Sequence, residues 1–184
     1  TPLHSSAASD VYKRQSEWQQ LLEGDSLVGS WGYSPAVETN STGDTLWWEL
    51  QWTSQEDANN AWGAWVQNED AMAWEEKYAS VLDCDGENRQ LHDVAYPMAS
   101  NAFGELPDTG YFYAEIHICE FNDGASKNDA LGFLEGFNNA VNEGGYEETS
   151  YHYGNYFQQG NDDGFLWGNF TNSKESMDKA NVAF

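Results

Sequence analysis

The stretch YFYAEIHICEF, residues 111–121, alternates between two kinds of side chain. Because successive side chains of a β-strand point to opposite faces, this alternation predicts one strand with two different faces. We expect the apolar face to pack against helices and the polar, aromatic face to point the other way. The apolar face holds Phe112, Ala114, Ile116 and Ile118, and the polar face holds Tyr113, Glu115, His117 and Cys119.

The sequence after this strand predicts four further elements. A turn rich in Asn, Asp and Gly comes next, and apolar residues at helical spacing then fill residues 130–143. Two strands are expected within 146–157 and 164–171, joined by a polar turn, and a second helix opens near Ser173. The predicted order is therefore β-α-β-β-α.

The first half of the chain shows the same order of elements. Strands are expected within 26–37 and 45–53, followed by a long helical stretch over 54–82 that breaks near Asn68. Superposing the halves places Ser30 on Ser150 and Tyr33 on Tyr153, and after a shorter hairpin it places Trp52 on Phe170 and Thr53 on Thr171. We interpret the match as an internal repeat.

The repeat predicts the fold class and the domain limits. A complete unit would be β-α-β-β-α-β, the ferredoxin-like plan, in an α+β protein with antiparallel sheets. The first repeat lacks its first strand and the second lacks its last, so we expect truncation at the N-terminus and, by the same register, at the C-terminus. The predicted parts are a tail over 1–15, a first repeat over 16–98, a linker over 99–110 and a second repeat over 111–184.

The first 15 residues share no pattern with the rest of the chain. The run DVYKRQ, residues 10–15, resembles a translated sequencing adapter, so we interpret the tail as an artefact. A native flexible tail is the alternative.

Charge and cysteine content restrict the classes of function. The chain has 31 Asp and Glu against 7 Lys and Arg, a net charge of -24, which repels nucleic acid and anionic membrane surfaces. No apolar run approaches the roughly 20 residues that cross a bilayer. Cys84 and Cys119 lie far apart and predict two reduced, partly buried thiols, which favours a cytoplasmic protein; one disulfide is the alternative.

The stretch WELQWTSQEDANNAW, residues 48–62, resembles the strand-to-helix passage of antibiotic-biosynthesis-monooxygenase-like domains. The residues that carry the resemblance are Trp52, Ser54, Glu56, Asp57 and Ala58. The Gly-rich segment GSWGY, residues 29–33, is similar to the second strand of that family.

This resemblance implies a dimeric-type α/β barrel, in which two ferredoxin-like sheets pack around a cavity. The two sheets can come from one chain or from a homodimer. It also implies a protein that binds a small molecule. The superfamily includes cofactor-independent oxygenases. Haem-degrading relatives carry a His on the second helix where this chain has Ala61 and Trp62, so we expect no cofactor.

The alternation of each strand predicts which side chains line that cavity. In the first repeat, Trp48, Leu50 and Trp52 would face the helices. The expected substrate-binding residues share an aromatic or polar side chain on the other face: Tyr113, Trp47, Glu49, Gln51, Trp167 and Asn169, with Phe165 beside them. His152 is a further candidate on a strand whose two faces are both polar and aromatic.

Glu115 and His117 are the candidate catalytic residues because they lie two apart on one strand face. His117 would deprotonate a phenolic substrate, Glu115 would orient the imidazole, and Asn169 or Gln51 would polarise a carbonyl. The alternatives are that this pair contacts the ligand without catalysing a reaction, or that it has only a structural role.

Two other interpretations of these residues stay open. His117, His152 and Glu115 could bind a metal if the strands bring them together. The sequence contains no metal-ligand motif, so we expect no metal site. The aromatic sheet face could instead form a subunit interface in a non-catalytic binding, structural or stress-related module.

Overall fold

A computed structural model describes residues 17–18, 20–21, 26–35, 46–81, 83–84, 86–95, 112–143 and 150–183. The chain is an α+β protein with antiparallel sheets, as the sequence predicts. It divides into two compact units, Thr1–Gly86 and Glu87–Phe184. The predicted tail over 1–15 and linker over 99–110 lie outside the described residues.

The first unit combines one hairpin with two consecutive helices. Ser54 and Asn68 cap the helices: Ser54 Oγ accepts from the Asp57 N–H, and Asn68 Oδ1 accepts from the Asp70 and Ala71 N–H groups. The helix break expected near Asn68 is therefore confirmed. The elements are β1 (Leu27–Tyr33), antiparallel β2 (Trp47–Trp52), α2 (Gln55–Trp65) and α3 (Glu69–Tyr78).

Tryptophans form the core of this unit. Trp18, Trp65 and Ala71 are buried, and partly buried hydrophobic side chains surround them. Trp48 and Leu50 belong to this surrounding group, so the prediction that they face the helices is confirmed. Trp48 also donates from Nε1 to Ser30 Oγ at 2.8 Å, which joins the two strands on the helix-facing side.

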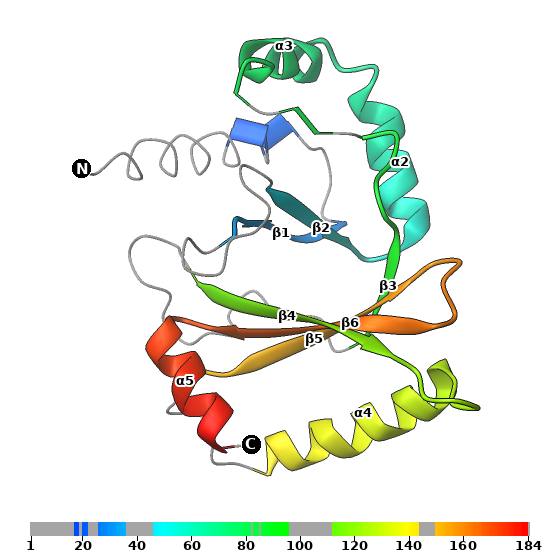
Figure 1. Ribbon diagram of the computed structural model, residues 1–184. Helices are drawn as coiled ribbons and strands as arrows, with labels where there is room; N and C mark the ends of the chain where they lie inside the picture. The colour runs from blue at the N-terminus through cyan, green and yellow to red at the C-terminus, as the bar shows by residue number, and fades with distance from the viewer. Residues whose placement is uncertain are drawn as a thin grey trace. The chain divides into compact units, whose positions relative to one another are not determined.

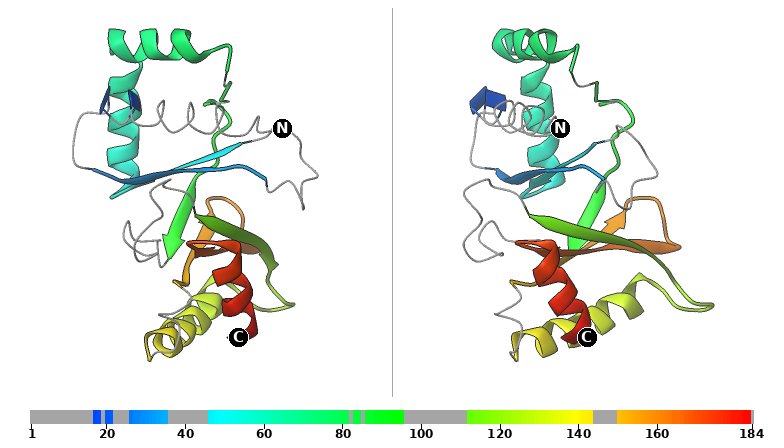
Figure 2. Two further views of the ribbon diagram at one scale, coloured as in Figure 1. Left: turned by 90° about the vertical axis from the view of Figure 1, so that its left-hand side faces the viewer. Right: turned by 60° about the vertical axis from the view of Figure 1, so that its left-hand side comes forward.

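The second unit contains one four-stranded antiparallel sheet in the order β3-β5-β6-β4. Helices α4 and α5 both lie on the same side of it (Figure 1), and the views in Figure 2 agree. From β4 onward the order is the predicted β-α-β-β-α. The elements are β3 (His92–Ala95), β4 (Tyr113–Glu120), α4 (Lys127–Asn142), β5 (His152–Gln158), β6 (Gly164–Thr171) and α5 (Lys174–Ala183).

Strand β3 differs from expectation in its partner. The sequence places it at the end of the first repeat, within 16–98, yet it pairs with β5 from His92 opposite Gln158 to Ala95 opposite Asn155. An ion pair of 2.9 Å between Asp93 and Lys127 of α4 reinforces this placement. Residues from Glu87 onward therefore group with the second unit.

The sheet of the second unit has the opposite orientation from the predicted one. Tyr153 donates to Asn138 of α4 at 2.8 Å, and Glu115 accepts from Asn181 of α5 at 3.3 Å. The face with Tyr113, Glu115, His117 and Cys119 therefore lies under the helices. Ile116 and Ile118 lie on the other face, where they are 41% and 82% exposed.

For β4, the expectation that the apolar face packs against the helices is wrong. For β6, a one-residue slip in the expected repeat register accounts for the reversed assignment. Ser173 Oγ accepts from the Ser176 N–H, as Ser54 Oγ accepts from the Asp57 N–H, so the two helices begin with the same kind of cap. Aligning the halves on these caps places helix-facing Trp48 on Trp167, whereas the sequence register places Trp52 on Phe170. Because side chains alternate along a strand, a shift of one residue moves every one of them to the other face.

Candidate functional site

Four of the predicted site residues come together under the helices of the second unit. Glu115 lies opposite Asn169, and His117 lies opposite Trp167, across the β4–β6 pairing. We call these four residues the β4–β6 cluster. His117 is exposed, while the other three are partly buried. The cluster therefore combines an accessible imidazole with a half-covered indole, amide and carboxylate.

Asn169 is the centre of a hydrogen-bond network. Its Oδ1 accepts from Trp167 Nε1 at 2.7 Å and from the Tyr151 hydroxyl at 2.8 Å. An indole N–H can only donate, so the amide oxygen must face Trp167. The amide nitrogen then faces His117, whose Nε2 lies 3.3 Å from Asn169 Nδ2. His117 Nε2 is therefore the acceptor, and the neutral ring carries its proton on Nδ1.

Aromatic rings form a wall beside this network. Trp167 and Tyr153 are stacked with ring centroids 5.9 Å apart, and Phe137 of α4 meets Trp167 edge-on at 4.9 Å. Phe133 lies 6.3 Å from Trp167 and is 62% exposed. A ring this exposed beside Trp167 leaves part of the aromatic surface available to a ligand.

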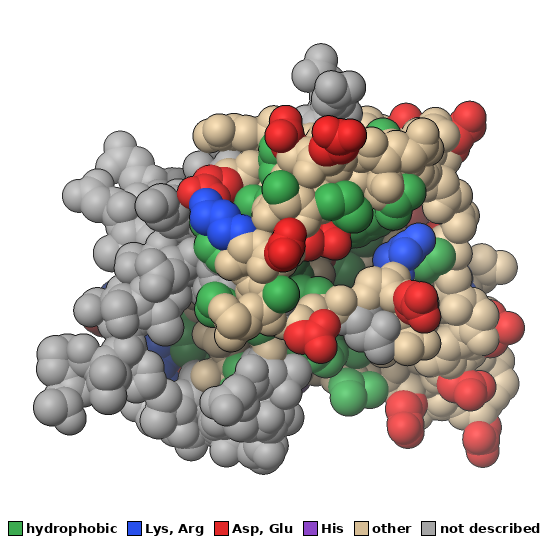
Figure 3. All heavy atoms as spheres, turned by 90° about the horizontal axis from the view of Figure 1, so that it is seen from above, with side chains coloured by type: hydrophobic (Ala, Val, Ile, Leu, Met, Phe, Trp, Pro, Cys, Tyr) green, Lys and Arg blue, Asp and Glu red, His purple; other side chains and the backbone are tan. Residues whose placement is uncertain are grey.

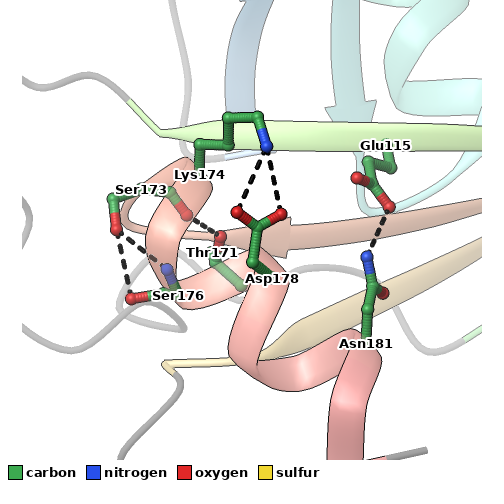
Figure 4. A network of polar contacts seen from close by, with 7 residues as sticks. All are labelled: Glu115, Thr171, Ser173, Lys174, Ser176, Asp178 and Asn181. Carbon is green, nitrogen blue, oxygen red and sulfur yellow. Dashed lines mark hydrogen bonds and ion pairs between the residues drawn. The ribbon is translucent and has the colours of Figure 1, made fainter.

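Glu115 is held by α5 rather than by His117. Figure 4 shows the Glu115 carboxylate and the Asn181 amide turned toward each other, and Asn181 Nδ2 donates to Oε2 at 3.3 Å. The same view shows how Ser173 and Ser176 begin this helix. Within the described residues no hydrogen bond joins Glu115 to His117, so the expected acid–imidazole pair is not formed there.

The remaining candidates of the second unit lie on different faces. Tyr113 shares the helix-facing side of the sheet and lies opposite Thr171. His152 lies on the other face, as the alternation with Tyr153 requires, and burial lowers the pKa of its imidazole. His117 and His152 therefore point to opposite sides, which rules out the metal site that would join them with Glu115. Among the described residues, no group of three or more His, Cys, Asp or Glu side chains could hold a metal.

Trp47, Glu49 and Gln51 lie together in the first unit. Glu49 accepts from the Tyr33 hydroxyl and from Gln51 Nε2, each at 2.7 Å. These side chains occupy the strand face away from Trp48 and Leu50. Trp47 is 56% exposed and Gln51 is buried, so this face carries a hydrogen-bonded carboxylate next to an open indole.

Both cysteines are free thiols, in agreement with the sequence. Cys84 is exposed, contrary to the expected partial burial, whereas Cys119 is half-buried. Burial raises the pKa of the Cys119 thiol, which keeps it protonated and unreactive near neutral pH.

Sequence reasoning missed three residues of this site. Tyr151 and Asn181 complete the hydrogen bonds of Asn169 and Glu115, and Phe133 extends the aromatic wall. Phe133 belongs to a helical apolar pattern that normally indicates core. No local signal distinguishes such an exposed position from a buried one, since exposure depends on the crossing of α4 over the sheet.

Comparisons with protein-family models, curated proteins and solved structures find no match for this chain. The helices of the described part of the chain are all too short or too polar to cross a membrane. The function is therefore argued from the geometry of the site.

Proposed function

We propose that the chain binds a small aromatic or otherwise apolar molecule at the β4–β6 cluster, between the sheet and helices of the second unit. The observation that carries this proposal is the Asn169 network, which presents exposed His117 in one tautomer beside the half-exposed rings of Trp167 and Phe133. Flat organic ligands favour sites with aromatic walls and a few oriented polar groups.

His117 would recognise an oxygen atom of the ligand. With Nε2 accepting from Asn169, the ring offers its Nδ1–H to an acceptor such as a phenolate or carbonyl oxygen. A proton-abstracting role would require His117 to give up the Asn169 hydrogen bond first. Glu115 would act on the ligand directly or through Asn181, since it does not orient the imidazole.

The finer form of the proposal is cofactor-independent oxygenation, which rests on the resemblance to monooxygenase-like domains. A phenol would be deprotonated, and its electron-rich anion would react with oxygen. One oxygen atom would become a second carbonyl of a quinone and the other would leave as water, so the substrate would supply all the electrons. The order β4-α4-β5-β6-α5 supports the ferredoxin-like unit on which this resemblance depends.

The test uses 2-naphthol as the probe. We expect saturable shifts of the Trp167 indole signal in NMR titrations, and loss of about tenfold in affinity on His117→Ala or Asn169→Leu, because a site built to hydrogen-bond an oxygen loses that bond. Glu120→Gln, on the same strand but the opposite face, is the control. Unchanged binding in both site variants would refute the site, and oxygen uptake separates turnover from binding.

One observation favours a second function, a subunit interface along the exposed edge strand β4. Ile116 and Ile118 are exposed there, and in the described residues β4 pairs only with β6. A long edge strand with exposed apolar residues tends to pair with another chain. We propose homodimer formation through this strand: Ile118→Lys should convert a dimer to a monomer in light scattering, and a monomeric unmodified protein would exclude the interface.

The reduced thiols support a cytoplasmic location, which we also propose. Fractionation of the source cells would test it.

A further inference from the structure

Two neighbouring cavities lie in the first unit and share no residue with the β4–β6 cluster. Their volumes are about 300 and 330 Å³, and Leu21 and Asp70 line both of them. Trp65 belongs to the wall of the first cavity and Trp74 to the wall of the second. These volumes are at the lower end of the range of about 300–1,000 Å³ typical of small-molecule sites, and the second cavity is a shallow hollow largely open to solvent.

The charged groups of the cavities leave one carboxylate unpaired. Lys77 is bound to Glu17 at 2.8 Å, and Glu17 also accepts from the Tyr78 hydroxyl at 2.6 Å. Asp70 uses only its backbone N–H, in the helix cap of Asn68, and no described residue donates to its carboxylate. The walls therefore carry a net negative charge located at Asp70.

The aromatic groups of the cavities are held in place. Trp65 and Trp74 meet edge to face at 6.0 Å, and Trp65 donates from Nε1 to Glu75 at 2.6 Å. This bond sets a second carboxylate at the edge of the Trp65 ring. Indole faces attract cations, and the attraction is largest for tryptophan. Figure 3 looks onto the surface that carries α3 and shows acidic side chains around exposed hydrophobic ones, with a hollow between them.

These features select one class of ligand. An anion is disfavoured by Asp70, Glu17 and the overall charge of -24. A hard metal ion needs six or more oxygen ligands, and the described residues gather no such group. A neutral apolar molecule would leave the Asp70 carboxylate unused. An organic cation satisfies both the carboxylate and the tryptophans.

We propose that these cavities bind a small organic cation, a quaternary ammonium or alkylammonium compound. Asp70 supplies the opposite charge, the partly buried Trp74 supplies cation–π contact, and the buried Trp65 supplies apolar wall. The site is separate from the aromatic-ligand site of the second unit, so either can exist without the other.

The test titrates the full chain with choline and with its uncharged isostere 3,3-dimethyl-1-butanol, at constant ionic strength. The readout is the indole N–H signals of Trp65 and Trp74 in NMR spectra. We expect saturable shifts with choline and at least about fivefold weaker binding of the isostere, because the cation–π and charge contributions are absent. Equal binding of the two compounds, or no saturable shift, overturns the proposal.

Two matched variants locate the charge. Asp70→Asn should weaken choline binding by about fivefold or more, since it removes the charge that faces the cavities. Glu69→Gln removes the same charge from the same helix turn without touching either cavity wall, and should leave choline binding unchanged. An equal loss in both variants would mean that choline responds only to the overall acidity, and would refute the site.

Discussion

At the scale of the residue, the buried amide of Asn155 is the least satisfied group of the second unit. It is fully buried, and neither its Nδ2 nor its Oδ1 has a hydrogen-bond partner among the described residues. An unsatisfied buried amide costs about 1–3 kcal/mol, so we expect Asn155→Leu to raise the free energy of unfolding by about 1 kcal/mol. Urea denaturation measures it.

Asn138 provides the matched control for this change. It accepts a hydrogen bond from Tyr153 at 2.8 Å, so Asn138→Leu should lower the free energy of unfolding. If Asn155→Leu destabilises as much as Asn138→Leu does, Asn155 is hydrogen-bonded in solution, for example to an internal water molecule.

Two tryptophans of the first unit also differ in whether their indole N–H is hydrogen-bonded. Trp65 Nε1 donates to Glu75 at 2.6 Å, whereas Trp74 Nε1 is buried and finds no hydrogen-bond partner in the part of the chain that the structure describes. Trp65 is also the more buried side chain. We therefore expect Trp65→Phe to cost about 1 kcal/mol more than Trp74→Phe in guanidinium unfolding. Equal costs would show that the Glu75 bond contributes nothing.

The two half-buried histidines predict a pH dependence of stability. Burial lowers the pKa of both His92 and His152 below the usual 6.5. The unfolded chain therefore binds protons more readily, and the free energy of unfolding should fall as the pH drops from 6.5 toward the folded pKa values. Urea midpoints at pH 7.5 and 5.5 measure this loss.

A double variant provides the control for that pH dependence. His92→Gln with His152→Gln should flatten the change between these two pH values. The hydrogen bond from Lys127 lowers the pKa of Asp93, whose contribution is lost only at still lower pH, below about 4. An unaltered slope in the double variant would assign the pH dependence to other groups.

At the scale of the element, the cap of α2 is the clearest determinant of a boundary. Ser54 Oγ accepts from the Asp57 N–H at 3.0 Å and donates to the Asp57 carboxylate at 2.6 Å. Ser54→Ala should destabilise the first unit by about 1 kcal/mol, while Ser54→Asp should retain most of the stability. Thermal unfolding followed by circular dichroism measures both, and a neutral Ser54→Ala would show that packing alone fixes this helix start.

The elements also show how far local pattern can predict the fold. The helix break at Asn68, the caps and the strands of the second unit follow from capping residues and periodicity, which act over a few residues. The direction in which each face of β6 points does not follow from these local signals. Phe165, Trp167 and Asn169 alternate with equally apolar Leu166 and Phe170, so no contrast in hydrophobicity pins the register.

At the scale of the whole molecule, the net charge of -24 is the dominant feature. Self-repulsion destabilises a compact state, and salt screens it over a Debye length of about 10 Å at 0.1 M. We expect the melting temperature to rise by several degrees between 20 mM and 500 mM NaCl. Sucrose at equal osmolality is the control, and a melting temperature that is independent of salt would contradict the repulsion argument.

Local pattern along the chain is enough to predict the class of the molecule. Composition and periodicity predict an α+β chain with antiparallel strands, the order β-α-β-β-α from residue 113 onward, and helix-facing Trp48 and Leu50. Each of these depends on neighbours within a few residues. They also predict that Glu115 and His117 share one face of their strand and that Trp167 and Asn169 share one face of theirs, because the alternation along a strand is a property of the backbone.

Contacts between distant parts of the chain settle where that face points and which strands join. Helices α4 and α5 cover the polar, aromatic face, and β3 pairs with β5 of the second unit. The physical reason is that aromatic side chains with polar tips can pack against a helix or face solvent with similar ease. Their hydrogen bonds decide between the two: Asn169, Asn138 and Asn181 find partners only when the chain is folded.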